Sequence, residues 1–121
     1  MTWNLRNDRP IYVQLMEIIK YQIISGVYKP GDKLPSVREF ATEASVNPNT
    51  MQKALTELER ENLIYTNRTS GKFISEDEAM IQKMRKDIAT QEIEKFLENM
   101  AKLGFTKQET ISIIEDITNK Q

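Results

Sequence analysis

Apolar residues recur at helical spacing near the start of the chain and predict a first helix over residues 10–26. Gly26, a residue common just beyond helix ends, stands at its end. Its apolar face is formed by Leu15, Ile18, Ile19 and Ile23.

Two further amphipathic helices follow, and only a short connection separates them. The second begins at Ser36, because Ser36 and Glu39 have the spacing of a capping box, and it ends near Ser45. The third spans residues 48–61, with an apolar stripe of Met51, Leu55 and Leu58. A tight turn between two such helices is typical of a helix-turn-helix unit.

A β-hairpin is predicted beyond the third helix. Residues 63–66 and 72–75 have the composition of strands, and residues 67–71 have that of the turn between them. The order helix, helix-turn-helix, hairpin predicts a mainly α fold with a small β-hairpin. We therefore expect a winged helix-turn-helix domain over residues 1–75.

The remaining residues, 76–121, predict a long charged helix over 76–103 and a shorter final helix that opens with a capping box at Thr106. Two helices cannot bury their own apolar stripes, so we expect a C-terminal two-helix dimerisation segment in a symmetric homodimer. The alternative is a tail that folds back onto its own winged helix. The residues expected at the dimer interface are Ile81, Met84, Ile88, Phe96, Met100, Phe105, Ile111 and Ile114.

The amino-acid composition of the chain argues against several classes of function. The chain has no Cys and no His, which argues against thiol catalysis, disulfides and the usual zinc sites. Glu57, Glu59 and Glu61 come without a nucleophile or a Gly-rich phosphate loop, so we expect no enzyme, no cofactor and no metal. The N-terminus lacks the apolar core of a signal peptide, and no apolar run approaches the length of a membrane span. We expect a cytoplasmic protein with no membrane partner.

Net charge is −1, which at first disfavours a nucleic-acid partner. Residues 1–75 carry 10 Lys and Arg against 8 Asp and Glu, a balance of +2, whereas residues 76–121 carry 7 against 10, a balance of −3. This mild asymmetry permits DNA binding by the N-terminal part without requiring it.

The polar residues that open the third helix are the main candidates for DNA contact, because a winged helix places this helix in the major groove with its N-terminal end leading. Asn and Gln can pair with adenine edges, so Asn49, Thr50 and Gln52 are expected to read bases. Lys53 could reach a guanine or a phosphate, and Asn47 is more a helix cap than a reader. A solvated polar face is the alternative.

Candidate backbone contacts lie on the second helix and the hairpin. Arg38 has no carboxylate four residues away on either side, which favours a phosphate or base contact. The backbone N–H of Ser36 could bind a phosphate at the helix start. In the hairpin, Arg68, Ser70, Gly71 and Lys72 suit minor-groove or backbone contact, although an ordinary solvated turn would have similar residues.

Several motifs in the same order resemble the DNA-binding domain of the GntR family of bacterial transcription regulators. They are Pro30-Gly31, the run Leu34-Pro35-Ser36-Val37-Arg38-Glu39, and the later run Leu55, Leu58, Leu63 and Ile64. The Val-Asn-Pro-Asn-Thr entry to the third helix and the short tail are similar to the YtrA branch of that family. The resemblance implies DNA contacts by Arg38, Thr50 and Gly71.

The chain also departs from the family pattern. Pro48 stands where many relatives have a DNA-contacting Arg, and Ser45 replaces the usual turn glycine. The hairpin tip carries a single glycine, Gly71, in place of two.

The expected function is that of a sequence-specific, dimeric repressor on an inverted-repeat operator, with double-stranded DNA and a second copy as partners. One alternative is a winged-helix module that binds protein. Another is a repressor that binds a small effector of unknown identity between the hairpin (the wing of the winged helix), the C-terminal tail and the partner chain. Trp3 is expected either to plug the core or to contact the partner.

Overall fold

The computed structural model describes residues 3–120. They fall into two compact units, Met1–Lys83 and Met84–Gln121. The division of domains after residue 75 stays a prediction, and the first compact unit extends past that residue to Lys83. The structure contains no helix long and apolar enough to cross a membrane among the described residues.

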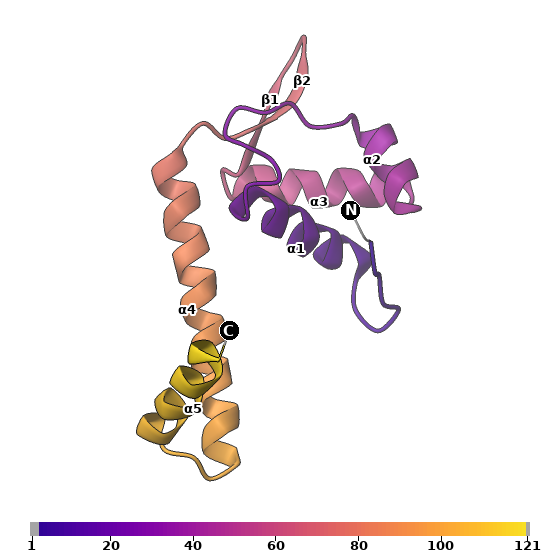
Figure 1. Ribbon diagram of the computed structural model, residues 1–121. Coiled ribbons are helices and arrows are strands. Elements are labelled where there is room, and N and C mark those ends of the chain that lie inside the picture. Colours follow the sequence, from indigo (N-terminus) through magenta and orange to yellow (C-terminus); the bar gives the residue numbers. More distant parts are fainter. Residues whose placement is uncertain (1–2, 121) are drawn as a thin grey trace. The chain divides into compact units, whose positions relative to one another are not determined.

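The described residues form five helices and one two-stranded antiparallel sheet, which confirms the predicted mainly helical fold with a small hairpin (Figure 1). The predicted order of helix, helix-turn-helix and hairpin is present. The elements are α1 (Ile11–Ile24), α2 (Val37–Ala44), α3 (Pro48–Arg60), β1 (Ile64–Asn67), β2 (Gly71–Ile74), α4 (Glu78–Lys102) and α5 (Lys107–Asn119).

The core of the first unit is formed by the apolar stripes that the sequence predicts. The side chains of Leu15 and Ile19 in α1, and of Met51, Leu55 and Leu58 in α3, are fully buried. Figure 1 shows α1 lying along α3. Burial of each of these side chains contributes about 1.5–3 kcal/mol, so this packing holds α3 with its apolar face inward.

Trp3 is half-buried and packs against the same core. Its ring meets Phe40 of α2 edge-on, with 5.8 Å between ring centroids. Phe40 is fully buried and also meets Tyr28 edge-on, at 6.4 Å. The contact with Phe40 favours the core role for Trp3.

The turn between α2 and α3 depends on a left-handed residue. Ser36 caps α2 by accepting a hydrogen bond from the Glu39 N–H, and the Glu39 carboxylate accepts one from the Ser36 N–H. Ser45 ends the helix with φ 58° and ψ 46°, the left-handed region. Two residues later Asn47 begins the cap of α3. The expected capping box of α2 and the expected cap of α3 are therefore present, and the turn is made without a glycine.

The hairpin, which we call the wing (residues 64–74), pairs Ile64 with Ile74 at its base and Asn67 with Gly71 at its tip. The segment before α2 runs along its second strand, since the Leu34 N–H donates to the Lys72 carbonyl at 2.9 Å. The Ile74 N–H likewise donates to the Asp32 carbonyl at 2.8 Å. The backbone thus holds the start of α2 beside the wing.

A polar cluster also ties the wing to α3. The Glu59 carboxylate accepts a hydrogen bond from the Thr66 hydroxyl at 2.7 Å and pairs with the Lys72 ammonium at 3.2 Å. Thr66 and Lys72 are opposite each other across the two strands. The Thr66 hydrogen bond, together with Lys72, lowers the pKa of Glu59 below its usual value.

In the second unit, the C-terminal part of α4 and α5 form a helical hairpin. The chain turns at Gly104, whose φ is +93°, and Thr106 then caps α5 in a capping box with Glu109. These hydrogen bonds lower the pKa of Glu109. Thr110 is buried against this hairpin, and its hydroxyl donates to the Thr106 carbonyl at 2.9 Å.

We predict that Ser45→Gly stabilises the protein, because glycine adopts the left-handed conformation without a Cβ clash. The clash costs about 1–2 kcal/mol, and the extra freedom of glycine in the unfolded chain offsets about 0.5–1 kcal/mol. The free energy of unfolding in urea should rise by about 0.5–1 kcal/mol. Ser45→Val is the matched control and should lower it, since a β-branched residue is strained at this φ. Equal stabilities of the two variants would contradict the prediction.

We predict that the Glu59 cluster makes stability depend on pH. A carboxylate whose pKa is lowered in the folded state stabilises the fold above its unfolded pKa, and this contribution is lost as pH falls through the folded pKa. Because Glu59 is partly exposed, the effect should be below about 1 kcal/mol. Thr66→Val should therefore flatten the loss of unfolding free energy below about pH 4.5. Thr69→Val, at the wing tip, should keep the parent slope, and a parent slope in Thr66→Val would refute the assignment.

Candidate nucleic-acid interface

The leading end of α3 is held by a local cap. The Asn47 side-chain oxygen accepts a hydrogen bond from the Asn49 N–H at 2.7 Å, and Pro48 occupies the first helical position, where no N–H is needed. This confirms that Asn47 acts as the helix cap. Its amide oxygen is occupied by the backbone, whereas the side chain of Asn49 is exposed.

Beyond the cap, α3 presents its polar residues outward. Asn49, Gln52 and Lys53 are exposed and Thr50 is half-buried, whereas the opposite face of the helix is buried in the core. Gln52 is partly engaged, because its amide donates to the Thr56 hydroxyl at 3.1 Å. The exposed edge is therefore available to a partner, with Asn49 and Thr50 at its leading end.

Arg38 lies exposed in the first turn of α2. Within residues 3–120 its guanidinium forms no ion pair or hydrogen bond. Ser36, one residue before the helix, differs from the expectation. Its backbone N–H donates to the Glu39 carboxylate at 3.2 Å, so the group expected to bind a phosphate is already satisfied within the capping box.

The wing tip is exposed at Arg68, Ser70 and Gly71. Gly71 has φ +110°, a backbone conformation that residues with a side chain rarely adopt, so glycine suits this position. Lys72 differs from the other predicted wing residues. Its side chain is only 15% exposed and its ammonium is paired with Glu59, because its position across from Thr66 points it to α3 and not to solvent.

A groove of about 410 Å³ separates the wing from the start of α2. Residues 33–37 and Glu39 line one side, and residues 66–72 line the other. Lys33 is exposed on this groove, where it pairs with Phe73 of β2 in an isolated antiparallel bridge. The sequence patterns did not mark it as a candidate because it lies outside the predicted helices and strands. Its position just before the Leu-Pro-Ser run was the only sequence signal, and pairing of the 32–34 segment with β2 is what brings it to the wing.

Four exposed cations without an ion pair lie on α2, on α3, on the wing and on the segment that pairs with β2, and they are Arg38, Lys53, Arg68 and Lys33. The acids at the far end of α3 have partners: Glu57 pairs with Arg60, Glu59 with Lys72 and Glu61 with Lys20. The acidic residues at the C-terminal end of α3 are thus paired, whereas these four cations have no carboxylate partner among the described residues.

The second unit carries a separate set of exposed apolar side chains. Phe96, Phe105, Ile111 and Ile114 are 38–46% exposed within the single chain. Met84, Ile88 and Met100 are half-buried. Ile81 differs, because at 3% exposure it is already covered in the first unit and needs no second copy. Ile93, Leu103 and Ile117 are further exposed apolar residues that the expected interface set did not include.

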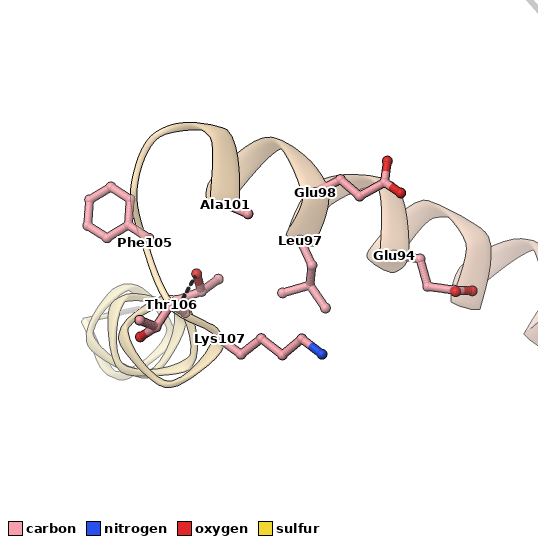
Figure 2. A pocket seen from close by; sticks show the side chains of 8 residues that line it. Glu94, Leu97, Glu98, Ala101, Phe105, Thr106 and Lys107 are labelled. Carbon is pink, nitrogen blue, oxygen red and sulfur yellow. Dashed lines mark hydrogen bonds between the residues drawn. The ribbon is translucent and has the colours of Figure 1, made fainter.

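A pocket of about 470 Å³ lies in the second unit, between the end of α4 and the first turn of α5. Figure 2 shows Leu97 of α4 pointing towards the first turn of α5, where Lys107 lies, while the neighbouring Glu98 points away from that turn and Glu94 lies farther along α4. The wall of this pocket combines apolar side chains with the charged groups of Glu94, Glu98 and Lys107.

The model of the family described as "Bacterial regulatory proteins, gntR family" matches residues 11–74, which is more than half of the chain. The uncharacterized HTH-type transcriptional regulator YhcF of Bacillus subtilis (strain 168) is 37% identical over 113 residues, 93% of each chain. The HTH-type transcriptional repressor YtrA of the same strain is 53% identical over 72 residues, 60% of this chain and 55% of that protein.

Solved structures with a similar fold support the same family assignment. A GntR family transcriptional regulator from Listeria monocytogenes superposes with a TM-score of 0.86 at 43% identity, covering 93% of this chain and 98% of that chain. AraR(DBD) in complex with operator ORX1 superposes with a TM-score of 0.54 at 28% identity, covering 62% of this chain and 92% of that chain. These relatives are transcriptional regulators, not enzymes. The family match, the similarity to YhcF over nearly the whole length and the winged helix-turn-helix fold together show that the chain belongs to the gntR family of bacterial regulatory proteins.

Proposed function

We propose that the chain is a sequence-specific DNA-binding repressor that acts as a homodimer on an inverted-repeat operator. The observation that carries this proposal is the exposed polar edge of α3, which includes the cation Lys53, on a helix whose other face is buried. The similarity to the repressor YtrA and to AraR(DBD) bound to an operator supports it.

Sequence reading is assigned to the first turns of α3. The Asn49 amide can donate to and accept from an adenine edge, and the Thr50 hydroxyl and methyl suit either a base edge or a thymine methyl. Gln52 is a weaker candidate, because its amide must leave the Thr56 hydroxyl first. Asn47 contributes by fixing the start of the helix.

Backbone binding is assigned to the surrounding cations. We assign contacts with the phosphate ridges beside the major groove to Arg38, exposed at the start of α2, and to Lys33, exposed in the groove beside the wing. Arg68 at the wing tip would reach the adjacent backbone or minor groove, with Ser70 and Gly71 allowing close approach. Lys72 and the backbone N–H of Ser36 are assigned a structural role in place of a DNA contact. Lys72 is paired with Glu59, and the Ser36 N–H donates to the Glu39 carboxylate.

Dimerisation is assigned to the second unit. Phe96, Phe105, Ile111 and Ile114 are exposed in the single chain, and burying such side chains between two copies would stabilise the pair. Met84, Ile88 and Met100, half-buried, lie on the same helix as Phe96. One domain with few cations binds DNA weakly, whereas two linked domains gain through effective concentration. Two-fold symmetry then implies half-sites about one helical turn apart, or a multiple of it.

We predict that Arg38→Ala and Thr50→Ala each weaken binding to the operator by about tenfold or more, because a base or phosphate contact of this kind contributes about 1–3 kcal/mol. The operator is first isolated by selecting bound duplexes from a random pool, and affinities are measured by fluorescence anisotropy. Arg60→Ala, at the far end of α3, is the matched control and should bind like the parent. Unchanged affinity in both test variants would contradict the proposal and favour a protein-binding module.

We predict that Ile114→Glu converts the dimer to a monomer, because it places a charge among the exposed apolar residues of α5. Sedimentation equilibrium measures the mass, and the same sample is tested for loss of operator affinity. Ser112→Glu adds the same charge on another face of α5 and should leave the dimer intact. A parent that sediments as a monomer, or an Ile114→Glu variant that remains dimeric, would refute the assignment.

A further inference from the structure

The ammonium of Lys53 lies over the ring of Tyr12, 4.0 Å from the ring centroid. This is a cation–π contact, in which the negative face of the ring attracts the charge. No carboxylate within residues 3–120 forms an ion pair with Lys53. The charge of Lys53 on α3 is therefore held by Tyr12 of α1. No sequence pattern had marked Tyr12 as a functional residue.

Tyr12 is itself firmly placed. It is the second residue of α1 and is half-buried. The chain that enters this helix is fixed by Gln14, which is 5% exposed. The Gln14 side chain accepts from the Arg6 N–H at 2.7 Å and donates to the carbonyls of Arg6 at 2.8 Å and Arg9 at 3.0 Å. The ring is thus a fixed surface, whereas Lys53 has a long flexible stem.

We propose that Tyr12 is a positioning residue that holds the Lys53 ammonium on the α1 side of α3 for contact with a backbone phosphate. This rests on the proposed function. The leading end of α3 carries Asn49 and Thr50, which are assigned to base edges, and the phosphate ridges flank a helix that lies in the major groove. A cation drawn to the α1 side is therefore directed to the backbone and away from base edges. The proposal thus assigns Lys53 to a phosphate and not to a guanine, the two contacts that the sequence left open for it.

The roles predict different binding behaviour. A phosphate contact strengthens binding to every duplex and adds about one unit to the slope of log affinity against log salt concentration. Lys53→Gln should therefore weaken binding to the selected operator and to a scrambled duplex by similar factors and reduce that slope by about one. A loss confined to one base position of the operator would overturn the phosphate assignment.

The positioning role is tested by a double-mutant cycle between Tyr12 and Lys53. Tyr12→Leu should weaken binding by about two- to fivefold, the size expected when an exposed cation–π contact is lost. In the Lys53→Gln background the same change should have no further effect, and Tyr12→Phe, which keeps the ring, should bind like the parent. An equal loss from Tyr12→Leu with and without Lys53 would overturn the proposal. Tyr12→Met replaces Tyr12→Leu if thermal melting shows the latter unfolded.

A measurement without DNA gives an independent readout. The ring current of Tyr12 should shift the Lys53 ε-methylene proton resonance upfield in the free protein, and the shift should persist in Tyr12→Phe and vanish in Tyr12→Leu. Absence of the shift in the parent, with operator binding intact, would overturn the positioning role alone. A parent that binds no duplex would overturn the proposed function and the phosphate contact with it, so the two failures are distinguishable.

Discussion

The packing of α3 on α1 is the contact on which the rest of the first unit depends. Met51, Leu55 and Leu58 are fully buried on one side of α3, and Leu15 and Ile19 of α1 are buried in the same core. Because a helix has a fixed angular repeat, burying this stripe sets the direction of every other side chain on α3. Asn49, Gln52 and Lys53 face solvent as a consequence, and the tight turn at Ser45 then places α2, with Arg38, beside them.

Charge is distributed along α3 in a way that suits a polyanionic partner. The acids at its C-terminal end are neutralised locally, by Lys20, Arg60 and Lys72, whereas Lys53 of α3, Arg38 of α2 and the two cations beside the wing, Lys33 and Arg68, have no carboxylate partner among the described residues. Net charge hides this arrangement, since the whole chain carries −1. The ion pair between Glu59 and Lys72 also has a structural role, because it holds the wing against α3 as well as neutralising the acid.

The second unit presents a different physical problem. Its two helices form a hairpin stabilised by the Thr106 capping box and by buried Thr110, yet several of its large apolar side chains remain exposed. Leaving this much apolar surface in water is unfavourable, and a second copy that covers it would offset the cost. The same association would raise the affinity of a weakly charged DNA-binding domain, so the exposed helices and the modest charge of the first unit are consistent with one mode of action.

The sequence by itself determined the elements and their order. Local rules fix helix periodicity, the caps at Ser36, Asn47 and Thr106 and the alternation of the hairpin, since each depends on residues within a few positions of one another. Only the tertiary structure decided which predicted site residues are exposed and unpaired, and so able to contact a partner. Lys72 is held by Glu59, Ile81 is buried in the first unit, and Lys33 and Tyr12 join the surface through neighbours distant in the chain. These outcomes depend on which side chains meet across elements, and no local pattern records that.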